Sequence, residues 1–324
     1  MGRELLSGFC IALLCVCGAA SAQPGEKAHA ADALTAQQVL EKSVAAYEAM
    51  ETYSSKGVTT MRLEMEQMPL TTTTEFTMKM QQPDRYLVSW SQTNNLLPGM
   101  PALKGAIWSD GTQPHLYVSM MNAWTTISED ATAFGAATGI SGGAAFTVPS
   151  LYLGLFGPRA FPFEGLKDPA VEGTERIGEE ECYVISAPSA ASKKETFWIS
   201  TTRWLVLKYE RSLEPPEDAP GIGEITDADV KAAIEAAGQD VTEESMRRMR
   251  STLDQAKELG PNLKGTLTEV HTEVGSPELT DADFRYDVPE GAQFKEKLFE
   301  GMLPTPAEPP PMEGDEPATP EEAE

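Results

Sequence analysis

The sequence predicts an α+β fold whose main body is an antiparallel β-sheet. Apolar and polar residues alternate along a series of runs after Gly57, and the links between most neighbouring runs are too short to hold a helix. Strands that follow one another through short links pair antiparallel. Clear helical periodicity is found instead before the first run and inside one segment, residues 214–262, which interrupts the later strands.

The composition narrows the function classes. The chain has 324 residues, of which 41% are hydrophobic, and this is enough to bury a sizeable core. Its formal net charge is −25, and a protein this acidic repels phosphate backbones, so we expect no nucleic-acid partner. More than half of the excess negative charge falls in residues 214–262 and in the tail from Glu300, outside the predicted sheet.

Residues 1–22 have the pattern of a secretory signal peptide. A short basic start precedes an apolar run at 9–17, and Ala20-Ser21-Ala22 is a typical cleavage site. The run is too short to span a bilayer. We therefore expect cleavage after Ala22, a periplasmic or otherwise exported protein, and no transmembrane anchor in the mature chain. Cys182 is then the only remaining cysteine, which excludes an intrachain disulfide and favours a small buried residue.

A polar linker, residues 23–34, is expected before the first helix. Thr35 is a suitable N-cap, with Gln38 three residues later as in a capping box. Apolar side chains then recur at helical spacing, at Val39, Leu40, Val44, Tyr47 and Met50.

The first strands follow from strict alternation. One set of alternate positions holds Thr59, Met61, Leu63 and Met65 in the first run, Phe76, Met78 and Met80 in the second, and Tyr86, Val88 and Trp90 in the third. Ser109-Asp110-Gly111 separates two further short runs, as in a β-hairpin. Residues 129–165 are rich in Gly and Ala, and we expect irregular or short helical structure there, lying over the sheet.

The second half repeats this alternation around the insertion. Strands are expected at 182–187, 195–200, 204–211 and 267–274. Within 214–262, caps at Thr226 and Thr242 predict two helices that end near Ala237 and Leu259. From residue 300 to 324 the chain is rich in Pro and Glu without Lys or Arg, which is typical of a disordered tail.

An ordered set of short motifs resembles a known family. The motifs are Gln82-Pro83-Asp84-Arg85-Tyr86, Ser109-Asp110-Gly111, Gly178-Glu179-Glu180-Glu181-Cys182-Tyr183, Phe197-Trp198-Ile199 with Trp204-Leu205-Val206, and the run from Phe284 to Ala292. In order and spacing they resemble the LolA-like superfamily of periplasmic lipoprotein carriers, most closely its uncharacterised branch with a domain of unknown function. The resemblance covers about residues 36–299 apart from the insertion.

The resemblance implies a more specific architecture. It implies an incomplete, half-open antiparallel β-barrel over residues 35–299, with an N-terminal lid helix and with 214–262 as an inserted helical hairpin. In such carriers an apolar cavity holds acyl chains. Arg85 falls where carriers use an arginine to hold the lid closed. The lid candidates are Leu40, Val44, Tyr47 and Arg85.

Methionine is concentrated in the predicted sheet, where nine of the fourteen lie between Met50 and Met121. Methionine is flexible and polarisable and therefore suits a surface that adapts to apolar ligands. The alternative is that these residues form an ordinary core under the helix. The candidates for a ligand cavity are Met61, Leu63, Met65, Phe76, Met78, Met80, Val88 and Trp90.

Other patterns suggest sites less strongly. Gly139-Ile140-Ser141-Gly142-Gly143 matches the G-x-S-x-G nucleophile motif of serine esterases, with His271 later in the chain, but it lacks the strand-to-helix context of that motif. We expect His271 on a solvated strand face beside Glu269 and Glu273. No spacing predicts a metal site, and no cofactor is expected. The repeated Thr-Asp-Ala-Asp is better explained by a helix cap and a turn than by calcium binding.

These observations lead to two main hypotheses. The first is a non-enzymatic exported protein that binds a lipid or an acylated protein and sequesters acyl chains on the concave sheet face, gaining about 0.8 kcal/mol per buried methylene. The second is an envelope sensor or protein-interaction module that uses the same fold, with the insertion and the tail docking an envelope protein. A serine esterase at Ser141 is a remote third.

Overall fold

The structure is a computed structural model. It describes residues 34–64, 69–96, 99–155, 160–189, 191–214, 226–236, 241–259, 264–296 and 298. The elements below belong to the compact unit that begins at Thr35. The predicted signal peptide, nearly all of the linker, Met65 and the acidic tail lie outside the described residues.

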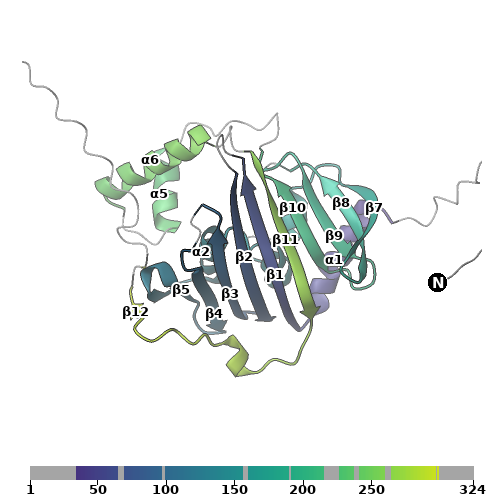
Figure 1. The fold of residues 1–324 in the computed structure, drawn as a ribbon, viewed down its shortest axis with the longest axis horizontal. Helices are drawn as coiled ribbons and strands as arrows, with labels where there is room; N and C mark the ends of the chain where they lie inside the picture. The colour runs from purple at the N-terminus through teal and green to yellow at the C-terminus, as the bar shows by residue number, and fades with distance from the viewer. Residues whose placement is uncertain are drawn as a thin grey trace, which may run out of the picture. The chain divides into compact units, whose positions relative to one another are not determined.

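One open sheet forms the body of this unit (Figure 1). Its strands are β1 (Thr52–Leu63), β2 (Leu70–Gln81), β3 (Arg85–Asn94), β4 (Leu103–Asp110), β5 (His115–Val118), β6 (Ala123–Thr126), β7 (Ala170–Ile177), β8 (Glu180–Ala187), β9 (Glu195–Ser200), β10 (Val206–Ser212), β11 (Gly265–Gly275) and β12 (Gln293–Phe294). The order is β12-β6-β5-β4-β3-β2-β1-β11-β10-β9-β8-β7. Every pair is antiparallel except β12 with β6. The α+β half-barrel fold is thereby confirmed.

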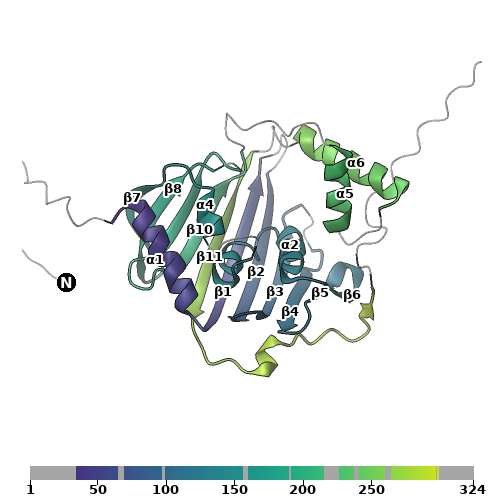
Figure 2. The ribbon, with the colours of Figure 1, turned by 180° about the vertical axis from the view of Figure 1, so that it is seen from behind.

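The helices α1, α2 and α4 lie over one face of this sheet, in front of the strands in Figure 2. The helices are α1 (Ala36–Ala49), α2 (Asp130–Ser141), α3 (Thr147–Leu153), α4 (Phe161–Glu164), α5 (Asp227–Ala236) and α6 (Glu243–Leu259), with 3₁₀ turns η1 (Ser119–Met121) and η3 (Asp281–Phe284). Thr35 and Gln38 form the expected capping box at α1. The segment expected to be irregular or briefly helical contains α2, α3 and α4.

Strand register sorts the side chains into two faces. Gly57 on β1 pairs with Phe76 on β2, and Phe76 pairs with Trp90 on β3, so these three residues share the face that the helices cover. We call this the inner face. A Cβ atom on Gly57 would lie 2.2 Å from the Phe76 ring, and one on Gly105 would lie 2.2 Å from the Trp90 ring. Both glycines therefore make room for an aromatic ring.

The inserted segment leaves the sheet after β10 and returns to it at β11, at two points that lie next to each other. Ser212 at the end of β10 pairs with Thr266 on β11, and the backbone N–H of Leu213 donates to the carbonyl of Gly265 at 2.9 Å. The segment that contains α5 and α6 therefore connects two paired strands. In the part of the chain that the structure describes, no helix combines the length and apolar character needed to cross a membrane.

The outer face of β3–β6 is covered by the last part of the described chain. Ala106, Trp108 and Tyr117 form a buried cluster, against which Tyr286 and Val288 pack. Two ion pairs hold η3 beside the strands: Lys79 Nζ lies 2.8 Å from Asp283 Oδ1, and Arg85 Nη2 lies 2.5 Å from Asp281 Oδ1.

Candidate ligand-binding site

The predicted cavity residues lie together on the inner face, and most of them are closed off from solvent. Phe76, Met78, Met80, Val88 and Trp90 are buried. Met61 and Leu63, near the C-terminal end of β1, are half-buried. Met65 lies outside the described residues. In this structure these residues form part of the buried core beneath the helices, as in the alternative of an ordinary core, and their role in holding a ligand stays a prediction.

Aromatic side chains attach the covering helices to the inner face. Phe134 on α2 packs on Tyr86, with ring centroids 4.6 Å apart. Tyr152 on α3 lies 5.9 Å from the ring of Tyr53, which in turn lies 6.0 Å from Tyr47 on α1. We call α1, α2 and α3 the cover, because each contributes a buried ring to this interior.

The first helix is docked through its predicted lid residues. Leu40 and Tyr47 are buried, and Val44 is half-buried. The backbone N–H of Val206 donates to the Tyr47 hydroxyl at 3.2 Å, which ties α1 to β10. Burial, together with the neighbouring Tyr53, raises the pKa of Tyr47 well above its ordinary value. Tyr47 therefore stays neutral at this contact between α1 and β10.

A groove runs between α1 and the segment around α4, and its walls carry both apolar side chains and the carboxyl groups of Glu41, Glu48 and Glu164. Its volume is about 310 Å³, and Leu40, Val44, Ala45, Phe163 and Leu166 are among its walls. Leu40 belongs both to this groove and to the buried core. A second hollow, of about 450 Å³ on the outer face, is lined by polar side chains such as Thr77 and Lys104 and also by Val58, Phe76 and Trp90. The groove beside α1 is the one that two of the lid candidates, Leu40 and Val44, line.

The contacts of Arg85 lead to η3. Besides its ion pair with Asp281, its Nη1 donates to Gln81 at 3.0 Å, and its guanidinium lies 4.4 Å from the centre of the Phe284 ring. The C-terminal end of α1 is contacted instead by Gln82, whose side-chain amide donates to the carbonyls of Tyr47 (3.3 Å) and Met50 (3.1 Å). Sequence reasoning missed Gln82, because the motif drew attention to the arginine.

A buried ionisable pair corrects one sequence expectation. His271 is buried on the inner face rather than solvated, because its register partner is Gly57. His271 Nε2 lies 2.6 Å from Glu269 Oε1, and its Nδ1 lies 3.2 Å from the hydroxyl of Ser55. Thr147 at the start of α3 donates to the other oxygen of Glu269 at 3.0 Å. We call Glu269 and His271 the buried pair.

The carboxylate of Glu269 starts a line of polar side chains across the inner face. Successive register partners place Glu269, Thr59, Thr74 and Gln92 side by side on β11, β1, β2 and β3, and we call these four residues the polar row. Thr74 donates to the carbonyl of Ser141 at 2.8 Å, and Gln92 donates to the carbonyl of Ile140 at 3.3 Å. The end of α2 therefore docks on the polar row, which satisfies helix-terminal carbonyls that would otherwise lack partners.

The geometry at Ser141 differs from a nucleophile elbow. Ser141 is the last residue of α2, and Gly142 follows it in the left-handed conformation as the helix cap. An elbow places the serine between a strand and a following helix. In addition, His271 is hydrogen-bonded to Ser55 and Glu269. The G-x-S-x-G match is explained here by a glycine-terminated helix.

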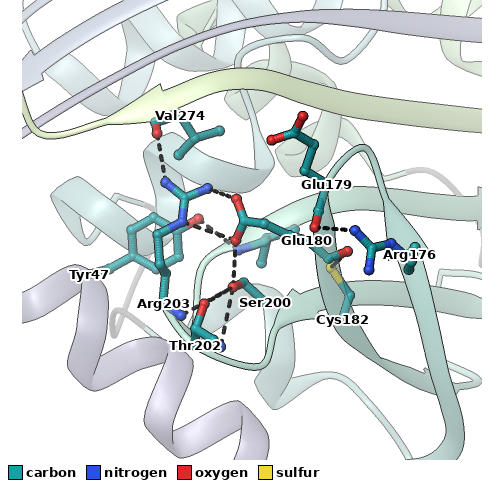
Figure 3. A network of polar contacts seen from close by, with 10 residues as sticks. Tyr47, Arg176, Glu179, Glu180, Cys182, Ser200, Thr202, Arg203 and Val274 are labelled. Atoms are coloured by element: carbon teal, nitrogen blue, oxygen red, sulfur yellow. Dashed lines mark hydrogen bonds and ion pairs between the residues drawn. The ribbon is translucent and has the colours of Figure 1, made fainter.

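A second polar network braces the sheet at the ends of β8, β10 and β11 (Figure 3). Arg203 Nε donates to Glu180 Oε2 at 3.1 Å, and its Nη1 donates to the carbonyl of Val274 at 2.6 Å. Ser200 also donates to Glu180, at 2.7 Å. Burial alone would raise the pKa of Glu180, but the hydrogen bonds from Arg203 and Ser200 lower it below its ordinary value. These contacts tie the start of β8 to the end of β11 and so stabilise the sheet.

The structure offers few features of a metal centre or a reactive thiol. Among the described residues, no group of three or more His, Cys, Asp or Glu side chains is arranged to hold a metal ion. Cys182 is buried, and this burial raises the pKa of its thiol to about 11. A thiol with so high a pKa is a poor nucleophile at neutral pH.

Comparison with known proteins adds a family. The family model described as "Predicted periplasmic protein (DUF2092)" matches residues 36–222, which is more than half of the chain. The chain belongs to this family. The DUF2092 match begins at α1 and ends inside the 214–262 insertion. The expected relation to an uncharacterised periplasmic family, and with it the periplasmic location, is confirmed.

Several solved structures resemble this DUF2092 protein at low sequence identity. An uncharacterised conserved protein from Thermus thermophilus is 12% identical, with 80% of this chain and 98% of that chain covered and a TM-score of 0.38. LprF from Mycobacterium bovis is also 12% identical, with 79% and 96% covered and a TM-score of 0.39. A LolA superfamily protein from Nitrosomonas europaea is 12% identical, with 78% and 99% covered and a TM-score of 0.26. No curated protein matches the sequence.

Proposed function

We propose that this protein is a non-enzymatic periplasmic carrier that binds a lipid or an acylated protein by holding acyl chains against the inner face of its open sheet. The observation that carries the proposal is the groove beside the lid candidate α1, whose apolar wall residue Leu40 also belongs to the buried core. An acyl chain that enters along this groove meets Met, Phe and Val side chains as soon as the cover moves.

The chemistry of the lining supports this function. Met78, Met80, Phe76 and Val88 give a surface with few polar atoms, and methionine adapts its shape to different chains. Each methylene that leaves water for this surface contributes about 0.8 kcal/mol. Because the lining is packed under the cover in this structure, binding requires α1 or its neighbours to shift by a hinge or shear motion.

Lipid extraction from gently purified mature protein, followed by native mass spectrometry, tests the proposal. We expect co-purifying lipid or lipid uptake after incubation with lipid extracts. Val44→Glu places a charge in the groove and should abolish this uptake. Ala49→Glu adds the same charge at an exposed position of α1 outside the groove and serves as the matched control. Wild-type protein that stays free of lipid after incubation would contradict the proposal.

Removing the insertion separates this function from a docking module. Leu213 and Gly265 are hydrogen-bonded across β10 and β11, so a short turn can replace residues 214–262. We expect the shortened protein to keep its lipid uptake. If the shortened protein keeps its fold but loses lipid uptake, the inserted helices, and not the inner face, bind the lipid.

A further inference from the structure

Two hydroxyl groups at the contact between the polar row and the end of α2 have no partner within the protein. Among the described residues, Thr59 Oγ1 and Ser141 Oγ are buried and make no hydrogen bond. Both border Thr74, since Thr59 is its register partner and the carbonyl of Ser141 accepts its hydrogen bond. Native proteins pair nearly all of their buried polar atoms. Ser43 and Tyr53 also have unpaired buried hydroxyls, but Thr59 and Ser141 are the two that lie beside one residue of the polar row, and this makes them candidates for holding a ligand.

The neighbouring ionisable groups are already satisfied. Both carboxylate oxygens of Glu269 have partners, in His271 and Thr147, and the other nitrogen of His271 has Ser55. The buried pair therefore has no free hydrogen-bonding position that would need a metal or a second charge. The pair is buried, and the ring of Phe76 meets the imidazole edge-on at 5.3 Å. A ligand group at the polar row would thus sit in a poorly hydrated site next to a carboxylate.

These surroundings select one ligand chemistry. A hydroxyl donates well to a carbonyl oxygen, and the carbonyl of an ester or amide brings no charge with it. A free fatty acid would place a second carboxyl group close to that of Glu269, where little water screens the interaction between two acidic groups and where His271 and Thr147 are already paired with Glu269. Building on the proposed carrier function, we propose that Thr59 and Ser141 donate hydrogen bonds to the carbonyl of an ester- or amide-linked acyl chain, and that Glu269 excludes free fatty acids.

Displacement of the fluorescent probe N-phenyl-1-naphthylamine measures this selectivity. The competitors are methyl palmitate, N-methylpalmitamide and palmitate, at pH 8, where palmitate is ionised. We expect the ester or the amide to displace the probe at a concentration at least about 10-fold below that of palmitate. Tighter binding of the ester points to glycerolipids as the source of the acyl chain, and tighter binding of the amide points to N-acylated proteins.

Thr59→Val tests the hydroxyl without changing the shape of the side chain. We expect affinity for the carbonyl compounds to fall about 5- to 10-fold, and the melting temperature to stay level or rise because an unpaired buried hydroxyl has been removed. A hydroxyl with a purely structural role would lower the melting temperature instead. Thr60→Val, one residue along β1 and on the outer face, is the matched control and should leave both quantities unchanged.

The outcomes separate this inference from the function on which it rests. Equal displacement by palmitate and methyl palmitate, or unchanged ester affinity in Thr59→Val, would overturn the carbonyl site and leave the carrier function standing. If none of the three compounds displaces the probe or binds directly, the carrier function and the carbonyl site both fall.

Discussion

Opening of α1 can be tested by removing a single oxygen. In Tyr47→Phe the ring stays in place, but the backbone N–H of Val206 loses the acceptor that it contacts at 3.2 Å. Val206 is fully buried, so water does not replace the lost partner. A buried donor left unpaired costs about 1–3 kcal/mol. If this cost applies only while α1 is docked, the ratio of open to closed protein rises by about 5- to 150-fold.

The expected result is faster ligand entry. When entry requires opening, the association rate of a fluorescent acyl probe in stopped-flow measurements rises by the same factor. Amide hydrogen exchange at Val206 should accelerate in parallel, because opening exposes that N–H. Tyr209→Phe is the control, since its hydroxyl donates to Glu195 at 2.6 Å within the sheet and does not involve α1. If Tyr47→Phe lowers the stability as expected but leaves the association rate unchanged, α1 is not the gate.

Three further predictions concern stability and chemistry. Gly57→Ala forces the Phe76 ring to move and should lower the free energy of unfolding, measured by urea denaturation, by about 1–3 kcal/mol. In the control Gly275→Ala the added methyl group meets no atom, so stability should not change. Equal effects of the two substitutions would contradict the packing argument. Lys79 lowers the pKa of Asp283 to about 2. Asp283→Asn should therefore lower the free energy of unfolding by about 1 kcal/mol or less at pH 7, and this difference should vanish as pH falls from about 4 toward 2. A difference that persists at pH 2 would rule out the ion pair as its cause. A fluorophosphonate should leave Ser141 unlabelled, and labelling there would revive the esterase hypothesis.

Much of the architecture could be predicted because alternation and caps are local signals. The capping box at Thr35 and the period of two through β1, β2 and β3 appear in the structure as expected. β7 was missed, because nearly all of its residues are exposed and its sequence shows no apolar alternation. Local patterns predict a strand when one of its faces is buried, and β7 has no such face.

The polar interior shows why the site was harder to predict. On β11 the valines at 270 and 274 suggest an apolar side opposite Glu269 and His271, and this assigns the polar residues to solvent. The structure reverses the assignment, since pairing with β1 places Glu269 and His271 inside. Only the partner strand decides which face is inner, and that information is not local to β11.

The open sheet also has a consequence for how the protein behaves at high concentration. An uncapped edge strand offers free backbone groups to any other chain, and this is a common start of edge-to-edge aggregation. One edge is β7, which carries Glu172, Glu175 and Arg176 and has an irregular register near Gly173, and the other is β12, which is only two residues long. Charges, a kinked backbone and a very short strand make poor templates for another strand. The sheet can therefore stay unclosed without recruiting copies of itself.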